Sequence, residues 1–161
     1  MPTIRSYPEA TTLAATDAFV IDVVGVGTEW IEAQNVLTQF GASCLTFIID
    51  GAGSVLSTGI AGDLDVPFAC TITGVVLLAD QSGSVVVDIW KDTYANYPPT
   101  NADSITASAP PTITSAAKSS DTTLTGWTKS IAAGDTLRFN IDSVTTITRV
   151  TVALAVTKVI A

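Results

Sequence analysis

The chain has 161 residues, of which 47% are hydrophobic and only 14% are charged, and its formal net charge is −8. This length can support one domain with a self-sufficient core. Only seven lysines and arginines are available to neutralise phosphates, so the composition argues against nucleic acid as a ligand. A typical globular domain has about 25% charged residues, so we expect part of this surface to be covered by copies of the chain or by a partner.

Residues 1–40 are predicted to form a small unit of strand, turn, strand and helix. DAFVID at 17–22 and EWIEA at 29–33 predict the strands, with glycines in the turn between them, and AQNVLTQF at 33–40 predicts the helix. Such a unit is too small to hold a core of its own, so we expect it to dock onto something larger. The candidate docking residues are Phe19, Trp30, Val36, Leu37 and Phe40.

From residue 41 to residue 161, apolar and polar residues alternate with a period of two. The alternating segments are LTFIID at 45–50, FACTITGVVLLAD at 68–80, SVVVDIW at 84–90, DTLRFNID at 135–142 and TRVTVALAVTKV at 148–159. In the second segment, the alternation predicts Cys70, Ile72, Val76 and Leu78 on one buried face, and QSG at 81–83 is predicted to turn the chain. Two packed antiparallel sheets bury all of these faces, so we predict an all-β fold, an antiparallel β-sandwich of jelly-roll type.

The segment VVVDIWKDTYANYPPTNADSI at 85–105 begins as a strand and continues into a polar loop with two tyrosines and two prolines. Because proline restricts the backbone, we predict an ordered loop whose tyrosines pack against a neighbouring strand or subunit. Trp90, Tyr94, Tyr97 and Trp127 lie at strand ends or in loops. These rings either plug the open end of the sandwich or form an interface or receptor contact.

The sequence contains no histidine, which removes the usual catalytic triads, the usual general base near neutral pH and the commonest zinc ligand. The two cysteines, Cys44 and Cys70, lie in apolar segments without a neighbouring lysine or arginine, so both are predicted to be buried free thiols. We therefore predict that the chain is not an enzyme and needs no cofactor.

Aspartates are the remaining candidates for chemistry. Asp63 and Asp65 are predicted on the same side of a strand, and Asp88 and Asp92 lie close together in sequence, so a glycosidase that uses carboxylates alone is an alternative. The simpler interpretation is that Asp63 ends a glycine turn, that Asp92 closes the loop and that Asp88 lies on a solvated or interface face.

Two glycine motifs could suggest ligand sites. GVG at 25–27 and GAG at 51–53 lack the rest of a nucleotide-binding fingerprint, so hairpin turns explain them better. Asp50, beside the second motif, is a candidate calcium ligand, but no spacing matches a known calcium loop. We therefore predict no metal site.

Six short segments form a distinctive set. They are SYPEATTLAATDAFVID at 6–22, IDG at 49–51, GDLDVPF at 62–68, DIWKD at 88–92 with the proline-bearing loop after it, LTGW at 124–127 and GDTLRFN at 134–140. Together they resemble segments that are widespread in virion proteins of tailed bacteriophages, of the tail fibre and minor tail protein type. The matching regions cover nearly the whole chain.

This resemblance implies a non-enzymatic structural protein of the virion, commonly a trimer, which is assembled in the host cytoplasm. Residues 1–40 would fasten to other virion proteins, and the sandwich would be displayed outward on a tail fibre or tail tip. The alternatives are a capsid decoration or head-fibre protein, or a carbohydrate-binding domain that recognises a host surface glycan through Tyr94 and Trp127. No secretory signal is evident, and the longest apolar runs, such as 75–79, are far shorter than the roughly 18 to 20 residues that cross a bilayer, so no membrane insertion is expected.

Overall fold

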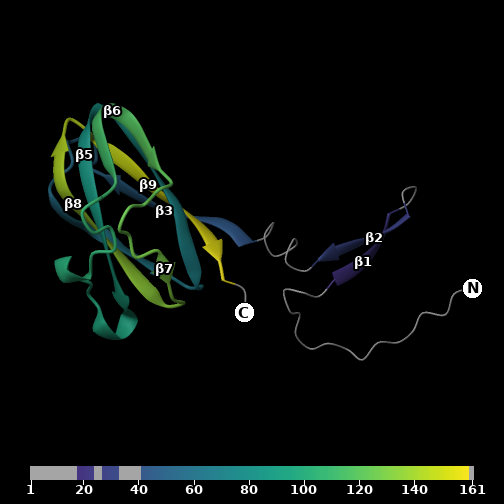
Figure 1. Cartoon of the computed structure of the whole chain (residues 1–161). Coiled ribbons are helices and arrows are strands. Elements are labelled where there is room, and N and C mark those ends of the chain that lie inside the picture. The colour runs from purple at the N-terminus through teal and green to yellow at the C-terminus, as the bar shows by residue number, and fades with distance from the viewer. Residues whose placement is uncertain (1–17, 24–26, 33–40, 160–161) are drawn as a thin grey trace, which may run out of the picture. The chain divides into compact units, whose positions relative to one another are not determined.

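The computed structural model describes residues 18–23, 27–32 and 41–159, and the chain divides into two units, Met1–Phe40 and Gly41–Ala161 (Figure 1). In the first unit, β1 (Ala18–Val23) pairs antiparallel with β2 (Gly27–Glu32), which confirms the predicted pair of strands. Phe19 lies in β1 and Trp30 in β2. The predicted helix at 33–40, with Val36, Leu37 and Phe40, lies outside the described residues.

The second unit is built from antiparallel strands. They are β3 (Ala42–Asp50), β4 (Gly59–Val66), β5 (Cys70–Thr93), β6 (Thr112–Asp121), β7 (Ser130–Ile131), β8 (Asp135–Thr145) and β9 (Arg149–Lys158), with short 3-10 turns η1 (Tyr94–Asn96) and η2 (Asn101–Asp103) after β5. The strand order is β3-β9-β5-β8-β4, and β6 and β7 also pair with β5. The predicted all-β, antiparallel, sandwich-like fold is confirmed, and it is formed by one curled sheet.

The long strand β5 belongs to both layers of the sandwich. Residues 70–79 pair with β9, and residues 84–93 pair with β8, so the sheet curls over at the segment between them (Figure 1). One layer therefore contains β3, β9 and the first half of β5, and the other contains β4, β8 and the second half. Phe47 of β3 stacks on Phe139 of β8 with ring centroids 4.3 Å apart, which brings the two layers into contact across the core.

Alternation along the strands fills the core as predicted in most places. Val85, Val87 and Ile89 of β5 are fully buried, as are Leu137 and Phe139 of β8. The same period-two pattern in β9 buries Val150, Val152, Leu154 and Val156. Removing these branched apolar side chains from water is the main source of stability for the sandwich.

The buried face predicted for the first half of β5 is wrong in its second part. The pairing between β5 and β9 shifts near Gly74, and this irregularity changes the alternation. Val75 and Leu77 therefore point into the core, whereas Val76 is half-buried and 49% of Leu78 is exposed.

The predicted turn at 81–83 is also wrong, because β5 continues through it as a bent strand. Side chains from this bend hold the connection between β8 and β9: Asp80 accepts hydrogen bonds from Thr148 and from the Arg149 N–H, and the Gln81 side chain donates to the Thr146 carbonyl. These hydrogen bonds, led by the one from the Thr148 hydroxyl, hold the pKa of Asp80 below its ordinary value.

Gly83 permits this bend because its backbone lies directly against the β8–β9 connection. A Cβ at this position would overlap with the Thr146 hydroxyl and the Thr145 carbonyl, and would lie 2.8 Å from Ile147 Cγ1. Since the first two neighbours are held by their own hydrogen bonds, they have little freedom to move.

We therefore expect Gly83→Ala to lower the free energy of unfolding by about 2 to 4 kcal/mol. Gly74→Ala is the matched control, because it lies in the same strand and its added Cβ would meet its nearest neighbours at 3.4 Å or more. Urea unfolding measures both; equal stability of the two variants would show that the close approach at Gly83 does not matter.

Candidate functional site

The carboxylate of Asp88 is buried, with only 7% of the residue exposed, so the prediction of a solvated or interface face is wrong. It accepts hydrogen bonds from the Ile89 N–H at 2.8 Å, the Trp90 indole at 2.7 Å, the Ser104 hydroxyl at 2.8 Å and the Thr106 hydroxyl. The last two donors belong to the loop after β5. Asp88 therefore fastens this loop onto the outer side of β5.

The loop is ordered, as predicted, and its backbone contributes to the order. The Ile105 N–H donates to the Ile89 carbonyl at 2.9 Å, which returns the chain to β5. In η2, the backbone N–H and hydroxyl of Thr100 both donate to the Asp103 carboxylate at 2.8 Å, and the Asp103 N–H donates back to the Thr100 carbonyl. These hydrogen bonds from Thr100 lower the pKa of Asp103.

The four candidate aromatic residues fall into two groups. Trp90 is buried beneath the loop, and Trp127 is buried with its indole N–H donating to the Ala109 carbonyl at 2.9 Å. Trp127 belongs to the core cluster, which favours the plug interpretation for this residue, whereas Trp90 lies on the outer side of β5 under the loop and does not plug the sandwich. Tyr94 and Tyr97 are 78% and 49% exposed, so both side chains are accessible to a ligand or a partner.

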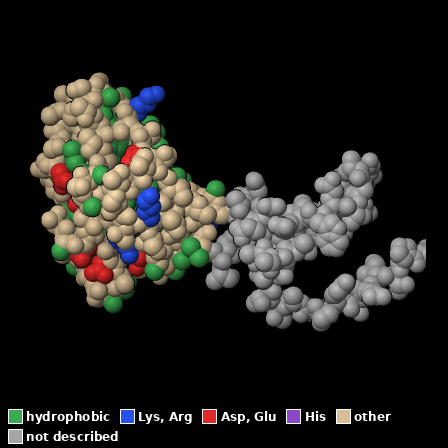
Figure 2. All heavy atoms as spheres, in the orientation of Figure 1, with side chains coloured by type: hydrophobic (Ala, Val, Ile, Leu, Met, Phe, Trp, Pro, Cys, Tyr) green, Lys and Arg blue, Asp and Glu red, His purple; other side chains and the backbone are tan. Residues whose placement is uncertain are grey.

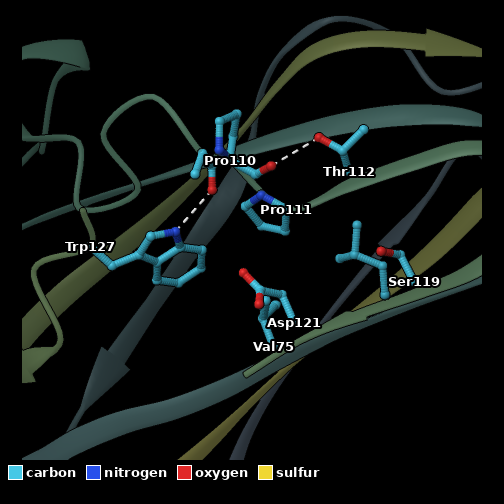
Figure 3. A pocket seen from close by; sticks show the side chains of 9 residues that line it. Val75, Pro110, Pro111, Thr112, Ser119, Asp121 and Trp127 are labelled. Atoms are coloured by element: carbon cyan, nitrogen blue, oxygen red, sulfur yellow. Dashed lines mark hydrogen bonds between the residues drawn. The ribbon is translucent and has the colours of Figure 1, made fainter. Parts of the chain in front are cut away.

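Trp127 borders a small cavity of about 140 Å³. Figure 3 shows it between the Trp127 indole, the Pro110-Pro111 pair and β6. Asp121 also lines it, but its carboxylate is engaged by two backbone N–H groups of the turn that follows. Ligand pockets usually have volumes of about 300 to 1,000 Å³, so this cavity is small for a binding site.

A larger cavity, of about 500 Å³, lies where the loop meets β4. It is lined by Asp63, Asp65, Tyr94, Tyr97 and Thr136. The two carboxylates come from alternate positions of β4 and so share one side of the strand, as predicted. The structure brings this pair together with the two tyrosines, whereas Trp127 lines the other cavity.

Arg138 organises one wall of this cavity. Its Nε lies 2.6 Å from Asp63 Oδ1 and its Nη2 lies 2.8 Å from Asp63 Oδ2. The Tyr97 hydroxyl donates to Asp63 Oδ2 at 2.8 Å and accepts from Arg138 Nη2 at 3.2 Å. Asp63 thus lies within β4 in an ion pair, and it does not end a turn as predicted.

This network sets the protonation of its members. The hydrogen bonds from the Arg138 side chain are the main cause that lowers the pKa of Asp63. The hydrogen bond to Asp63 raises the pKa of Tyr97, so its hydroxyl stays protonated as the donor. A glycosidase needs one carboxylic acid that retains its proton, and the environment of Asp63 has the opposite effect.

No metal centre is seen in the part of the chain that the structure describes, since no group of three or more potential ligands lies together there. Asp50, the candidate calcium ligand, accepts a hydrogen bond from the Ala52 N–H at 2.7 Å and so closes a turn. Among the described residues, no helix is long and apolar enough to span a membrane.

The outward side of β3, β9 and the first half of β5 forms a second candidate surface, called here the uncharged face. This face consists of three rows of opposed residues, Ile48–Thr151–Leu78, Thr46–Ala153–Val76 and Cys44–Ala155–Gly74. Charged residues border these rows: Lys118 of β6 lies opposite Leu78, and Asp50 lies opposite Arg149 at the next outward position of β3 and β9. Cys44 is exposed on this face, so the prediction that it is buried is wrong, while Cys70 is buried as predicted.

Comparison with known proteins leaves the family open. No protein-family model and no curated protein matches the chain. Among solved structures, it is similar to RmlC from Streptococcus suis, solved in complex with dTDP-D-xylose, with 11% sequence identity and a TM-score of 0.27. The similarity covers 90% of this chain and 63% of that chain. A likeness this distant carries no argument about function, and the fold and cavities define a β-sandwich protein with an acidic, tyrosine-lined site.

The ion pair between Asp63 and Arg138 predicts a pH dependence of stability. Because the pKa of Asp63 is lower in the folded chain than in the unfolded chain, its contribution is complete above the unfolded pKa and is lost as the pH falls through the folded value. We expect Asp63→Asn to lower the free energy of unfolding by about 1 to 2 kcal/mol at neutral pH. This difference from the wild type should shrink as the pH falls below about 4. Urea unfolding at several pH values measures it; a difference that stays constant down to about pH 2 would contradict the assignment.

Proposed function

We propose that the chain is a non-enzymatic structural protein of a tailed-bacteriophage virion, a tail-fibre, tail-tip or other appendage protein. Residues 1–40 attach it to other virion proteins, and the sandwich assembles with copies of itself, with a trimer as the expected state. The resemblance of the six sequence segments supports the virion assignment. The uncharged face is the observation that supports self-assembly.

The uncharged face has the chemistry of a surface that packs against protein. Its middle strand, β9, contributes only Thr151, Ala153 and Ala155, so the larger Ile48 and Leu78 flank a row of small residues. A face of this kind can pack closely against another sheet. Since the chain has a net charge of −8, contact between copies is least opposed where charges are absent.

Several placements on the particle agree with this proposal. A capsid decoration or head-fibre protein would use the same two units, one for attachment and one for display. A role in contacting the host surface needs a ligand site on the sandwich, and the cavity lined by Tyr94 and Tyr97 is the candidate for it.

If the chain assembles through the uncharged face, the mass of the full-length protein in solution should be a multiple of the mass of one chain. We expect wild-type protein to sediment as an oligomer and Leu78→Glu to weaken association roughly tenfold or more, because a carboxylate would replace an apolar contact. Lys118 of β6, which lies opposite Leu78, offsets only part of the cost of burying that charge. Ile60→Glu is the matched control, since Ile60 is 51% exposed on β4, in the other layer, and Leu78 is 49% exposed. Analytical ultracentrifugation distinguishes the species. A wild type that stays monomeric at about 100 μM, or equal effects of both variants, would contradict the proposal.

Thiol reactivity gives an independent check of the same face. Cys44 is exposed in the single chain, so we expect it to react about tenfold more slowly with a thiol reagent in assembled wild type than in Leu78→Glu. Cys70 is the internal control. Burial is the main cause that raises its pKa, the charge of Asp135 adds to the rise, and it should stay unreactive in both proteins. Equal reactivity of Cys44 in both proteins would show that another surface mediates assembly.

A further inference from the structure

The cavity between β4 and the loop has a chemistry that selects one class of ligand. We propose that it binds an alkylammonium group, with Asp65 accepting hydrogen bonds from the ammonium and Tyr94 and Tyr97 packing against the alkyl chain. This inference goes beyond the proposed virion role and does not depend on it.

Hydrogen-bonding capacity is the first argument. An ionised carboxylate only accepts hydrogen bonds, and an ammonium group only donates them. The Tyr97 hydroxyl already donates to Asp63 and accepts from Arg138, so it has little to offer a ligand. A neutral saccharide presents acceptors as well as donors, and the donors left for it here are the hydroxyls of Thr136 and Tyr94. The lining therefore suits a ligand that only donates.

Charge is the second argument. Arg138 offsets the charge of Asp63, whereas Asp65 is in neither of the two salt bridges found among the described residues. Asp92 lies opposite Thr136 in the β5–β8 pairing and adds a further negative charge near the cavity. Figure 2 shows several of the visible acidic side chains at the lower end of the sandwich, where Figure 1 draws the turn after β5. A cation is favoured in this field, and an anion is repelled.

The tyrosines and the size of the cavity supply the third argument. A cation near the face of an exposed aromatic ring gains about 0.5 to 1 kcal/mol, and an alkyl chain can pack on the same ring. Tyr97 is already held by Asp63 and Arg138, whose Cζ lies 5.3 Å from the ring centroid, so a ligand does not have to order it. A volume of about 500 Å³ accommodates a short alkyl chain with several waters.

The test is a titration of the full-length, ¹⁵N-labelled chain with n-pentylammonium chloride, followed by NMR at constant ionic strength. We expect saturable shifts centred on the backbone amides of Asp65, Tyr94 and Tyr97, with a dissociation constant in the millimolar range, as such an exposed site implies. 1-Pentanol has nearly the same shape without the charge and should give much smaller shifts. Methyl α-glucoside represents a neutral saccharide and should give none at this site.

Variants assign the binding to the named groups. Asp65→Asn removes the charge with little change in shape, and we expect it to weaken pentylammonium binding about fivefold or more. Tyr94→Ala should weaken it about threefold. Asp142→Asn is the control for net charge, because Asp142 is an exposed aspartate of β8 that does not line the cavity, and it should bind as the wild type does.

A further arm identifies the source of the ammonium. Nα-acetyl-lysine methylamide carries the same ammonium group on a peptide backbone. If it binds as well as pentylammonium does, a lysine side chain of a partner fits the site. If only pentylammonium binds, a free amine is the ligand.

Three results would overturn the proposal. They are no saturable shift up to about 100 mM, equal shifts with pentanol or the glucoside, and unchanged binding by Asp65→Asn.

Discussion

The buried carboxylate of Asp88 is the contact on which the ordered loop and its cavity depend. Burying a charge is unfavourable unless donors compensate it, and Asp88 has four, two from β5 itself and two from the loop. Because the loop hydroxyls come from Ser104 and Thr106, the carboxylate fixes the far end of the loop on β5. The near end then carries Tyr94 and Tyr97 out to β4, where the Tyr97 hydroxyl meets Asp63 and Arg138.

The outer sides of the two layers of the sandwich differ in chemistry. The outer side of β5 and β8 carries polar groups such as Asp88 and Arg138, and the loop of the same chain covers part of it. The outer side of β3 and β9 carries small and apolar residues with few charges and has no such cover from the described residues. This difference supports both proposals, self-assembly through the uncharged face and ligand binding beside the loop.

Much of the fold could be predicted from local sequence patterns. Period-two alternation identified the strands and the burial of Val85, Val87 and Ile89, because side chains on a strand alternate between its faces. The same rule failed at Val76 and Leu78, since the shift in pairing near Gly74 depends on how β5 meets β9 and leaves no mark in local alternation.

The candidate site was predictable only in part. The pairing of Asp63 with Arg138 joins residues 75 positions apart, and only the register of β4 against β8 brings them together. Likewise, the donors that bury Asp88 lie 16 and 18 residues after it, so its local sequence resembled that of a solvated position. The tyrosines were found because exposed aromatic residues in a proline-bearing loop are an unusual local signal.

Hydrogen exchange in Asp88→Asn tests the central role of this carboxylate most directly. Asparagine keeps the shape of the side chain but presents an N–H₂ donor to groups that themselves donate, so the loop should detach more often. We predict that the Ile105 amide, which donates to Ile89, exchanges about tenfold faster or more, and that its acceleration exceeds that of the Leu154 amide in the core strand β9. An unchanged rate for Ile105, or equal acceleration of both amides, would contradict the account.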